Sequence, residues 1–178
     1  MAQDVTIAAQ WSTVLDAVVA LWGRVDVLVN NAGIANIVDI ENISLETWSR
    51  TLNINLTGVF LGTQAAIGRM KGKGGSIVNI ASISGLRAST LRVAYGTSKA
   101  ALIHLTKQQA VELGTVGIRV NAIAPGPVET EMAKLVHSVA IRSDYHHVIP
   151  LERQGTPEES ASATGVLRRQ PASCVHGQ

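Results

Sequence analysis

The chain has 178 residues, about the size of one domain, and 46% of them are hydrophobic, which suffices for a buried core and argues against disorder. Its 15 basic and 13 acidic side chains leave a net charge of +2, which argues against a surface that binds nucleic acid. Its apolar runs are far shorter than the roughly 20 residues that cross a bilayer, and its N-terminus lacks the pattern of a secretory signal.

The first predicted elements are a helix and a strand. Apolar residues at helical spacing predict a helix over residues 13–22, which Gly23 ends. Residues 25–29 are rich in valine and predict a buried strand. This strand ends at a polar turn, Asn30-Asn31-Ala32-Gly33.

A longer helix and a second strand follow. Ser44 is a suitable N-cap for a helix over residues 45–70, and Asn55 marks a break in its apolar pattern. The glycine-rich residues 72–75 end this helix. Residues 76–80 then predict a second buried strand.

The last predicted elements are a long helix over residues 95–113 and a third strand over residues 117–124. The pattern weakens over residues 130–156, which we expect to form a segment beside the site. Pro157-Glu158-Glu159 is typical of the first turn of a helix, and the helical pattern fades near Arg168.

Strands that are almost continuously apolar and alternate with helices predict an α/β fold, with a parallel sheet covered by helices on both faces. The polar or glycine-rich residues follow the strands, at residues 31–33, 82–85 and 125–130. Because the carboxyl ends of parallel strands meet at one edge of the sheet, we expect a ligand site there.

The pattern most suggestive of chemistry is Tyr95-x-x-x-Lys99, which places a phenol and an ammonium one helical turn apart. A phenol is a poor acid or base at neutral pH, since its usual pKa is about 10. A nearby positive charge stabilises the phenolate and would make Tyr95 a usable general acid or base. Taken alone, however, such a pair is more often a surface pair.

Three other polar features are weak evidence for a functional site when each is taken alone. Ser82 follows the second strand, where its hydroxyl could bind a substrate oxygen or form a turn. Asn55 interrupts an apolar helix, where it could hold a water molecule or mark a kink. The turn at residues 30–33 could approach a flat ligand or end the strand.

Together and in register, these features resemble the short-chain dehydrogenase/reductase family over about residues 4–160. The matching motifs are Asn30-Asn31-Ala32-Gly33, Asn55, Ser82, Tyr95-x-x-x-Lys99 and Pro125-Gly126-x-x-x-Thr130. The resemblance implies a Rossmann-type fold and hydride transfer between NAD(H) or NADP(H) and an alcohol/ketone pair.

The resemblance also implies catalytic roles for four residues. Tyr95 would be the general acid/base, and Ser82 would anchor the substrate oxygen. Lys99 would bind the nicotinamide ribose and lower the pKa of the tyrosine. Asn55 would hold the water of a proton relay.

The same resemblance assigns residues to the NAD or NADP site, without indicating which of the two is used. Asp4 and Val5 resemble the family's pair beside the adenine. The remaining residues would line the cofactor, mostly at its nicotinamide end: Asn31, Ala32, Gly33, Tyr95, Lys99, Pro125, Gly126, Val128 and Thr130.

The sequence also departs from the family pattern. It lacks the Thr-Gly-x-x-x-Gly-x-Gly loop whose helix receives the pyrophosphate. We therefore expect residues 1–178 to form a single, incomplete NAD(P)-binding domain, truncated at both ends and lacking the first βαβ unit and the last strand. The strand ending at Asn30 would then leave an unpaired edge, and we expect low stability or aggregation unless a partner covers it.

Partners and substrates are predicted only by class. The resemblance implies a homodimer or homotetramer formed through the helices at residues 57–70 and 95–113, where Gly58 and Gly62 would permit close approach or serve internal packing. The substrate would be a small alcohol or ketone of the 3-oxoacyl, sugar, polyol or steroid type. Its pocket would draw on residues 130–156, including Leu135, Val139, Tyr145 and His146.

Two alternative functions remain open. The chain could be a family member that cannot hold the cofactor and is inactive or serves only as an oligomer partner. It could also be a sugar-nucleotide epimerase or dehydratase, although Pro125-Gly126 and the compact spacing favour the dehydrogenase branch. One cysteine, Cys174, fits a cytoplasmic protein without disulfides, and five histidines without zinc-ligand spacing predict no metal site.

Overall fold

The structure of the chain, a computed structural model, describes residues 1–136, 149–168 and 174–178. Its longer elements in chain order are α1 (Ala8–Trp22), β1 (Val27–Asn30), α2 (Leu45–Leu52), α3 (Gly58–Met70), β2 (Gly75–Ile80), α4 (Val93–Leu113), β3 (Ile118–Ile123), α5 (Glu131–Val136) and α7 (Pro157–Leu167). Three short helical turns, η1 (Asn53–Thr57), η2 (Ile83–Gly85) and η3 (Gly114–Val116), lie between them.

The three strands form one parallel sheet in the order β1-β2-β3. The register places Leu28 beside Ile77, and Ile77 beside Val120. These side chains belong to the main buried core. The predicted α/β fold with a parallel sheet is confirmed.

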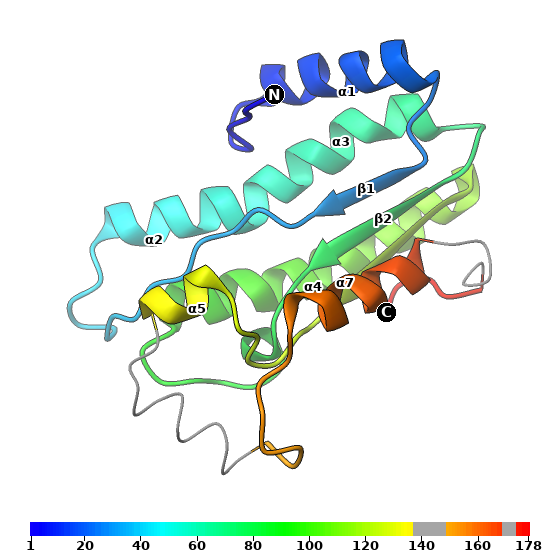
Figure 1. Cartoon of the computed structure of the whole chain (residues 1–178). Helices are drawn as coiled ribbons and strands as arrows, with labels where there is room; N and C mark the ends of the chain where they lie inside the picture. Colours follow the sequence, from blue (N-terminus) through cyan, green and yellow to red (C-terminus); the bar gives the residue numbers. More distant parts are fainter. Residues whose placement is uncertain (137–148, 169–173) are drawn as a thin grey trace.

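Helices cover both faces of this sheet (Figure 1). The core packs Trp11 of α1, Met70 of α3 and Ala110 of α4 against one face. On the other face lies α7, where the Leu167 carbonyl accepts hydrogen bonds from Ser76 Oγ and an Arg119 guanidinium nitrogen. Side chains alternate along each strand, so the two faces carry different residues of the same strands.

The predicted break near Asn55 is confirmed as a π-helical turn, η1, between α2 and α3. Ser44 caps α2 as predicted, because its side chain accepts a hydrogen bond from the Thr47 backbone. A π-helical turn inserts an extra residue into the helix, and such insertions often occur at functional sites.

Gly58 and Gly62 of α3 serve packing within the chain. A Cβ on Gly58 would lie 2.8 Å from Val5 Cγ2, and one on Gly62 would lie 2.8 Å from the Trp11 ring. The surface over these two glycines is therefore already covered. Of the two roles considered for them, internal packing explains the structure, and close approach between subunits does not.

The two outer strands of the described sheet differ at their outer edges. β1 is at one edge, and its Val29 side chain is 40% exposed. Along β3, the Gly177 amide donates to Val120 O and the Ala122 amide donates to Gln178 O. The C-terminal residues therefore pair with the edge of β3 without forming a fourth named strand.

Among the described helices, none combines the length and the hydrophobicity that a membrane span requires.

Candidate functional site

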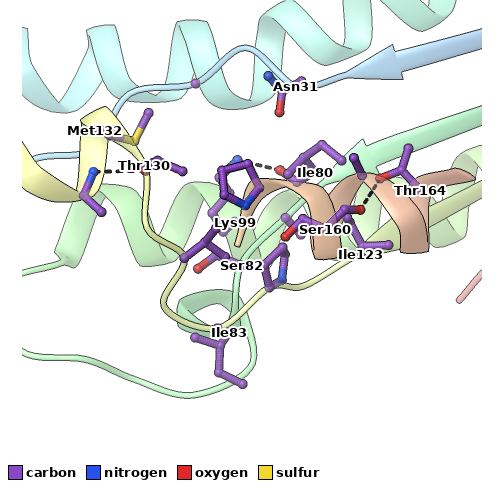
Figure 2. A pocket seen from close by; sticks show the side chains of 18 of the residues that line it. Asn31, Ile80, Ser82, Ile83, Lys99, Ile123, Thr130, Met132, Ser160 and Thr164 are labelled. Carbon is purple, nitrogen blue, oxygen red and sulfur yellow. Dashed lines mark hydrogen bonds between the residues drawn. The ribbon is translucent and has the colours of Figure 1, made fainter. Parts of the chain in front are cut away.

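A cavity of about 1260 Å³ opens at the carboxyl edge of the sheet. Figure 2 shows Lys99 and Ser82 close together in it, with Asn31 on one side and Ser160 of α7 on another. Most of the predicted site residues line this cavity: Asn31, Ala32, Gly33, Ser82, Tyr95, Lys99, Pro125, Gly126, Val128 and Thr130. The structure thus brings together segments from all three strand ends, as expected for a parallel sheet.

Tyr95 and Lys99 lie in the first two turns of α4. The Lys99 Nζ is 5.8 Å from the centroid of the Tyr95 ring. It donates a 2.7 Å hydrogen bond to the carbonyl of Ile80, at the end of β2. This bond fixes the ammonium beside the phenol and leaves two of its three protons for a ligand.

Ser82 follows β2 and is 8% exposed. Its Oγ accepts a 3.2 Å hydrogen bond from the Ser84 amide. Among the described residues, neither the Ser82 hydroxyl nor the Tyr95 hydroxyl has an acceptor for its proton. Two hydroxyl groups in one cavity are thus available to a ligand oxygen.

Gly33 lies between two polar side chains at the end of the polar turn. A Cβ at this position would lie 3.2 Å from Asn55 Oδ1 and 3.6 Å from Lys99 Nζ. Any larger residue would therefore crowd Asn55 and reach the ammonium. A glycine keeps this part of the cavity wall flat, which suits close approach of a planar ring.

Asn55 lies behind the cavity wall and is fully buried. Its side-chain amide donates to Ile34 O and accepts from Ile34 N, at 2.9 and 2.8 Å. It also donates to Ser98 Oγ at 3.0 Å, and Ser98 donates to the Tyr95 carbonyl at 2.7 Å. Asn55 thereby ties the loop after Gly33 to the first turn of α4. Its role in a proton relay stays a prediction.

Asp4 and Val5 do not line the cavity. The Asp4 carboxylate accepts from the Thr6 amide and hydroxyl, at 2.9 and 2.7 Å. Val5 packs against α3, and its carbonyl accepts from the Trp11 indole. Their predicted place beside an adenine stays a prediction. Val139, Tyr145 and His146 lie outside the described residues, and Leu135 is exposed.

One wall of the cavity was not predicted from the sequence. Ser160 and Thr164 lie one turn apart on α7, Arg168 directly follows this helix, and all three line the cavity. The capping box of Thr156 and Glu159 fixes where this helix begins. Their four-residue spacing could have indicated a polar side of a helix, although this spacing does not by itself show which element α7 packs against.

Burial of Lys99 lowers its pKa from 10.5 to about 8. The unfolded chain keeps this proton up to about pH 10.5, so the folded state binds fewer protons between pH 8 and 10.5. The free energy of unfolding should therefore rise with pH across that window. The buried ammonium should destabilise the fold to its full extent below pH 8.

We expect Lys99→Met to raise the free energy of unfolding at pH 7 by about 1–2 kcal/mol, because removal of a buried charge outweighs the hydrogen bond lost at Ile80. Urea unfolding at pH 7 to 10 measures this, and the gain should shrink as the pH rises. Lys107→Met, at an exposed position of the same helix, is the matched control and should be nearly neutral. A Lys99→Met protein that is less stable than wild type at pH 7 would contradict this account.

Comparison with known proteins gives consistent matches. A family model described as enoyl-(acyl carrier protein) reductase matches residues 1–178. A 3-alpha-(or 20-beta)-hydroxysteroid dehydrogenase of Mycobacterium bovis is 51% identical over 134 residues, which are 75% of this chain and 52% of that protein. The chain thus spans about half the length of this relative.

Two solved structures are similar over 99% of this chain. One is a gluconate 5-dehydrogenase from Burkholderia cenocepacia in complex with NADP and tartrate, with a TM-score of 0.93, 32% identity and 70% of its chain covered. The other is a short-chain type dehydrogenase/reductase from Mycobacterium ulcerans, with a TM-score of 0.93, 37% identity and 65% of its chain covered.

Proposed function

Because the chain belongs to the short-chain dehydrogenase/reductase family, we propose that it interconverts an alcohol and a ketone with NAD(H) or NADP(H) as the redox partner. One observation carries the proposal. Ser82, Tyr95 and Lys99 line a single cavity together with the polar turn at residues 31–33 and the Pro125-Gly126 segment.

Ser82 and Tyr95 would act on the substrate oxygen. The Ser82 hydroxyl would donate a hydrogen bond to it and hold the reacting carbon in place. Tyr95 would give its proton to that oxygen when a ketone is reduced and take it back when an alcohol is oxidised. The Lys99 ammonium would stabilise the negative charge on the phenol oxygen.

The residues present fit the nicotinamide end of the cofactor. Gly33 leaves the wall beside Lys99 open, and Lys99 retains two protons for ribose hydroxyls. When bound, the nicotinamide would supply or accept the hydride, while the protein orients it and moves the proton. The complex of a similar protein with NADP supports use of such a cofactor.

In the competing proposal, the chain forms this cavity and does not bind the cofactor by itself. Residues 1–178 contain no Thr-Gly-x-x-x-Gly-x-Gly motif, and in the family the loop with this motif and its helix receive the pyrophosphate. Such a chain would serve as an oligomer partner or be inactive. Phe60 on α3 and Val111 on α4 are exposed apolar side chains that could contribute to an interface.

Titration with NADH and NADPH separates the two proposals. We expect a saturable change in nicotinamide fluorescence with at least one of them, and oxidation at 340 nm when a ketone is added. Ser82→Ala should lower turnover about 100-fold, because it removes one hydrogen-bond donor to the substrate oxygen. Ser12→Ala, at an exposed position of α1, should leave turnover unchanged. No saturable signal at millimolar cofactor would leave only the competing proposal.

A further inference from the structure

The cavity wall formed by residues 127–129 is bonded to the segment that leads into α7. Pro127 O accepts a 2.9 Å hydrogen bond from the Gly155 amide, and the Glu129 amide donates a 3.0 Å bond to Gly155 O. These two bonds enclose Val128, which forms a parallel bridge with Gly155 and lines the cavity. Gly155 directly precedes Thr156, the N-cap of α7. The position of this part of the wall therefore depends on how residues 153–156 are held.

The Glu159 carboxylate of α7 holds those residues. Its Oε2 accepts a 2.8 Å hydrogen bond from the Thr156 amide and a 2.9 Å bond from Arg153 Nη1. Its Oε1 accepts a 2.7 Å bond from Arg153 Nη2, so the guanidinium and the carboxylate form a fork of two bonds. Arg153 Nη1 also donates to the Gln154 carbonyl at 3.1 Å. One ion pair thus fixes the backbone on both sides of Gly155.

Gly155 lies between this ion pair and the cavity wall. A Cβ on Gly155 would lie 3.6 Å from Glu159 Oε2 and 3.7 Å from Pro127 O. Only one residue therefore separates the carboxylate from the wall. The hydrogen bonds from Arg153 and the Thr156 amide hold the pKa of Glu159 at about 2, so the carboxylate stays charged at neutral pH.

The effect of this ion pair should be local. Both side chains are about half exposed, and exposed ion pairs usually add little to the stability of the whole fold. Neither Arg153 nor Glu159 is among the described residues that line the cavity, although Val128 is. Each of the two therefore acts on the wall through Gly155.

We propose that Arg153 and Glu159 are positioning residues, whose ion pair holds Gly155 so that residues 127–129 keep the conformation that binds the nicotinamide end of the cofactor. This inference rests on the proposed function for the identity of the ligand. A wall that adopts the binding conformation for only part of the time raises the apparent dissociation constant in proportion.

Hydrogen exchange tests the position of the wall without cofactor or substrate. The reporters are the amides of Gly155 and Glu129, and the amide of Val78 in the central strand is the reference for global unfolding. We expect Glu159→Gln to speed exchange at both reporters by about 10-fold relative to Val78. A glutamine can still accept the Thr156 bond of the capping box, so this variant removes the charge and keeps the cap.

Cofactor binding is the second measurement. We expect Glu159→Gln and Arg153→Gln each to raise the dissociation constant of NADH or NADPH, measured by nicotinamide fluorescence, by about 5- to 10-fold. The double variant should match the single variants, because the two side chains act as one unit. Glu158→Gln removes the neighbouring acid from the same first turn and so has the same effect on the helix dipole. This control should keep wild-type exchange and binding.

Three results would overturn the assignment. The first is unchanged exchange at Gly155 and Glu129 in Glu159→Gln. The second is faster exchange with an unchanged dissociation constant, because the wall would then loosen without consequence for the cofactor. The third is an equal effect of Glu158→Gln, which would indicate the helix dipole. If wild type binds neither cofactor, the proposed function fails, and the exchange rates alone decide whether the ion pair positions the wall.

Discussion

Tyr95→Phe is expected to lower kcat at least about 1000-fold with any ketone that wild type reduces. The substitution removes only the phenol oxygen, so the ring near Arg92 and Lys99 stays in place. General acid catalysis by a positioned group contributes about 100- to 10,000-fold. The rate of absorbance loss at 340 nm measures the effect.

The binding of cofactor should survive this substitution. We expect the dissociation constants of NADH and NADPH from nicotinamide fluorescence to change less than about threefold, because the contacts at Gly33, Lys99 and the Pro125-Gly126 segment are retained. The thermal unfolding midpoint should also stay near that of wild type. If Tyr95→Phe retains substantial kcat, the proton must move through another group and the proposed role of Tyr95 is wrong.

Gly85→Ala is the substitution expected to affect the fold most. An added Cβ would lie 2.6 Å from the Lys99 carbonyl carbon and 2.8 Å from the Ala100 nitrogen. Both atoms belong to the backbone of α4, so neither can turn aside as a side chain can. We expect a loss of at least about 2 kcal/mol in the free energy of unfolding, because η2 must move away from α4. Urea unfolding measures this loss.

Gly68→Ala is the matched control for that substitution. Gly68 lies within α3, and a Cβ there would meet no atom within 4 Å. In an exposed helix interior alanine is preferred over glycine, so this variant should be about 0.5–1 kcal/mol more stable than wild type. Equal effects of the two substitutions would show that η2 does not approach α4 as closely as described.

The secondary structure was largely predictable because its signals are local. The three strands are mostly apolar and are followed by polar or glycine-rich turns, and the helix over 95–113 differs from α4 by two residues. The break at Asn55 was visible as a polar residue in an apolar helix. The first helix begins at Ala8 rather than residue 13, since Trp11 packs into the core and no capping side chain marks its start.

The site was predictable only in part, because its connections join residues that are distant in sequence. The amide of Asn55 meets Ser98, 43 positions away, and only the folded chain shows this bond. The wall formed by α7 depends in the same way on where that helix packs. Arg92, which lines the cavity and lies over the Tyr95 ring, was not predicted because a single arginine before a helix has no distinctive pattern.

In the proposed reaction, this cavity places a nicotinamide beside a substrate carbon and gives the substrate oxygen a proton from Tyr95. Transfer of deuterium from NADH or NADPH labelled at C4 to the carbinol carbon of the alcohol product, followed by mass spectrometry, tests it most directly. We expect deuterium at that carbon with wild type and at least about 1000-fold less per unit time with Tyr95→Phe. Alcohol product without deuterium from either face of the labelled cofactor, or no alcohol product at all, would contradict it.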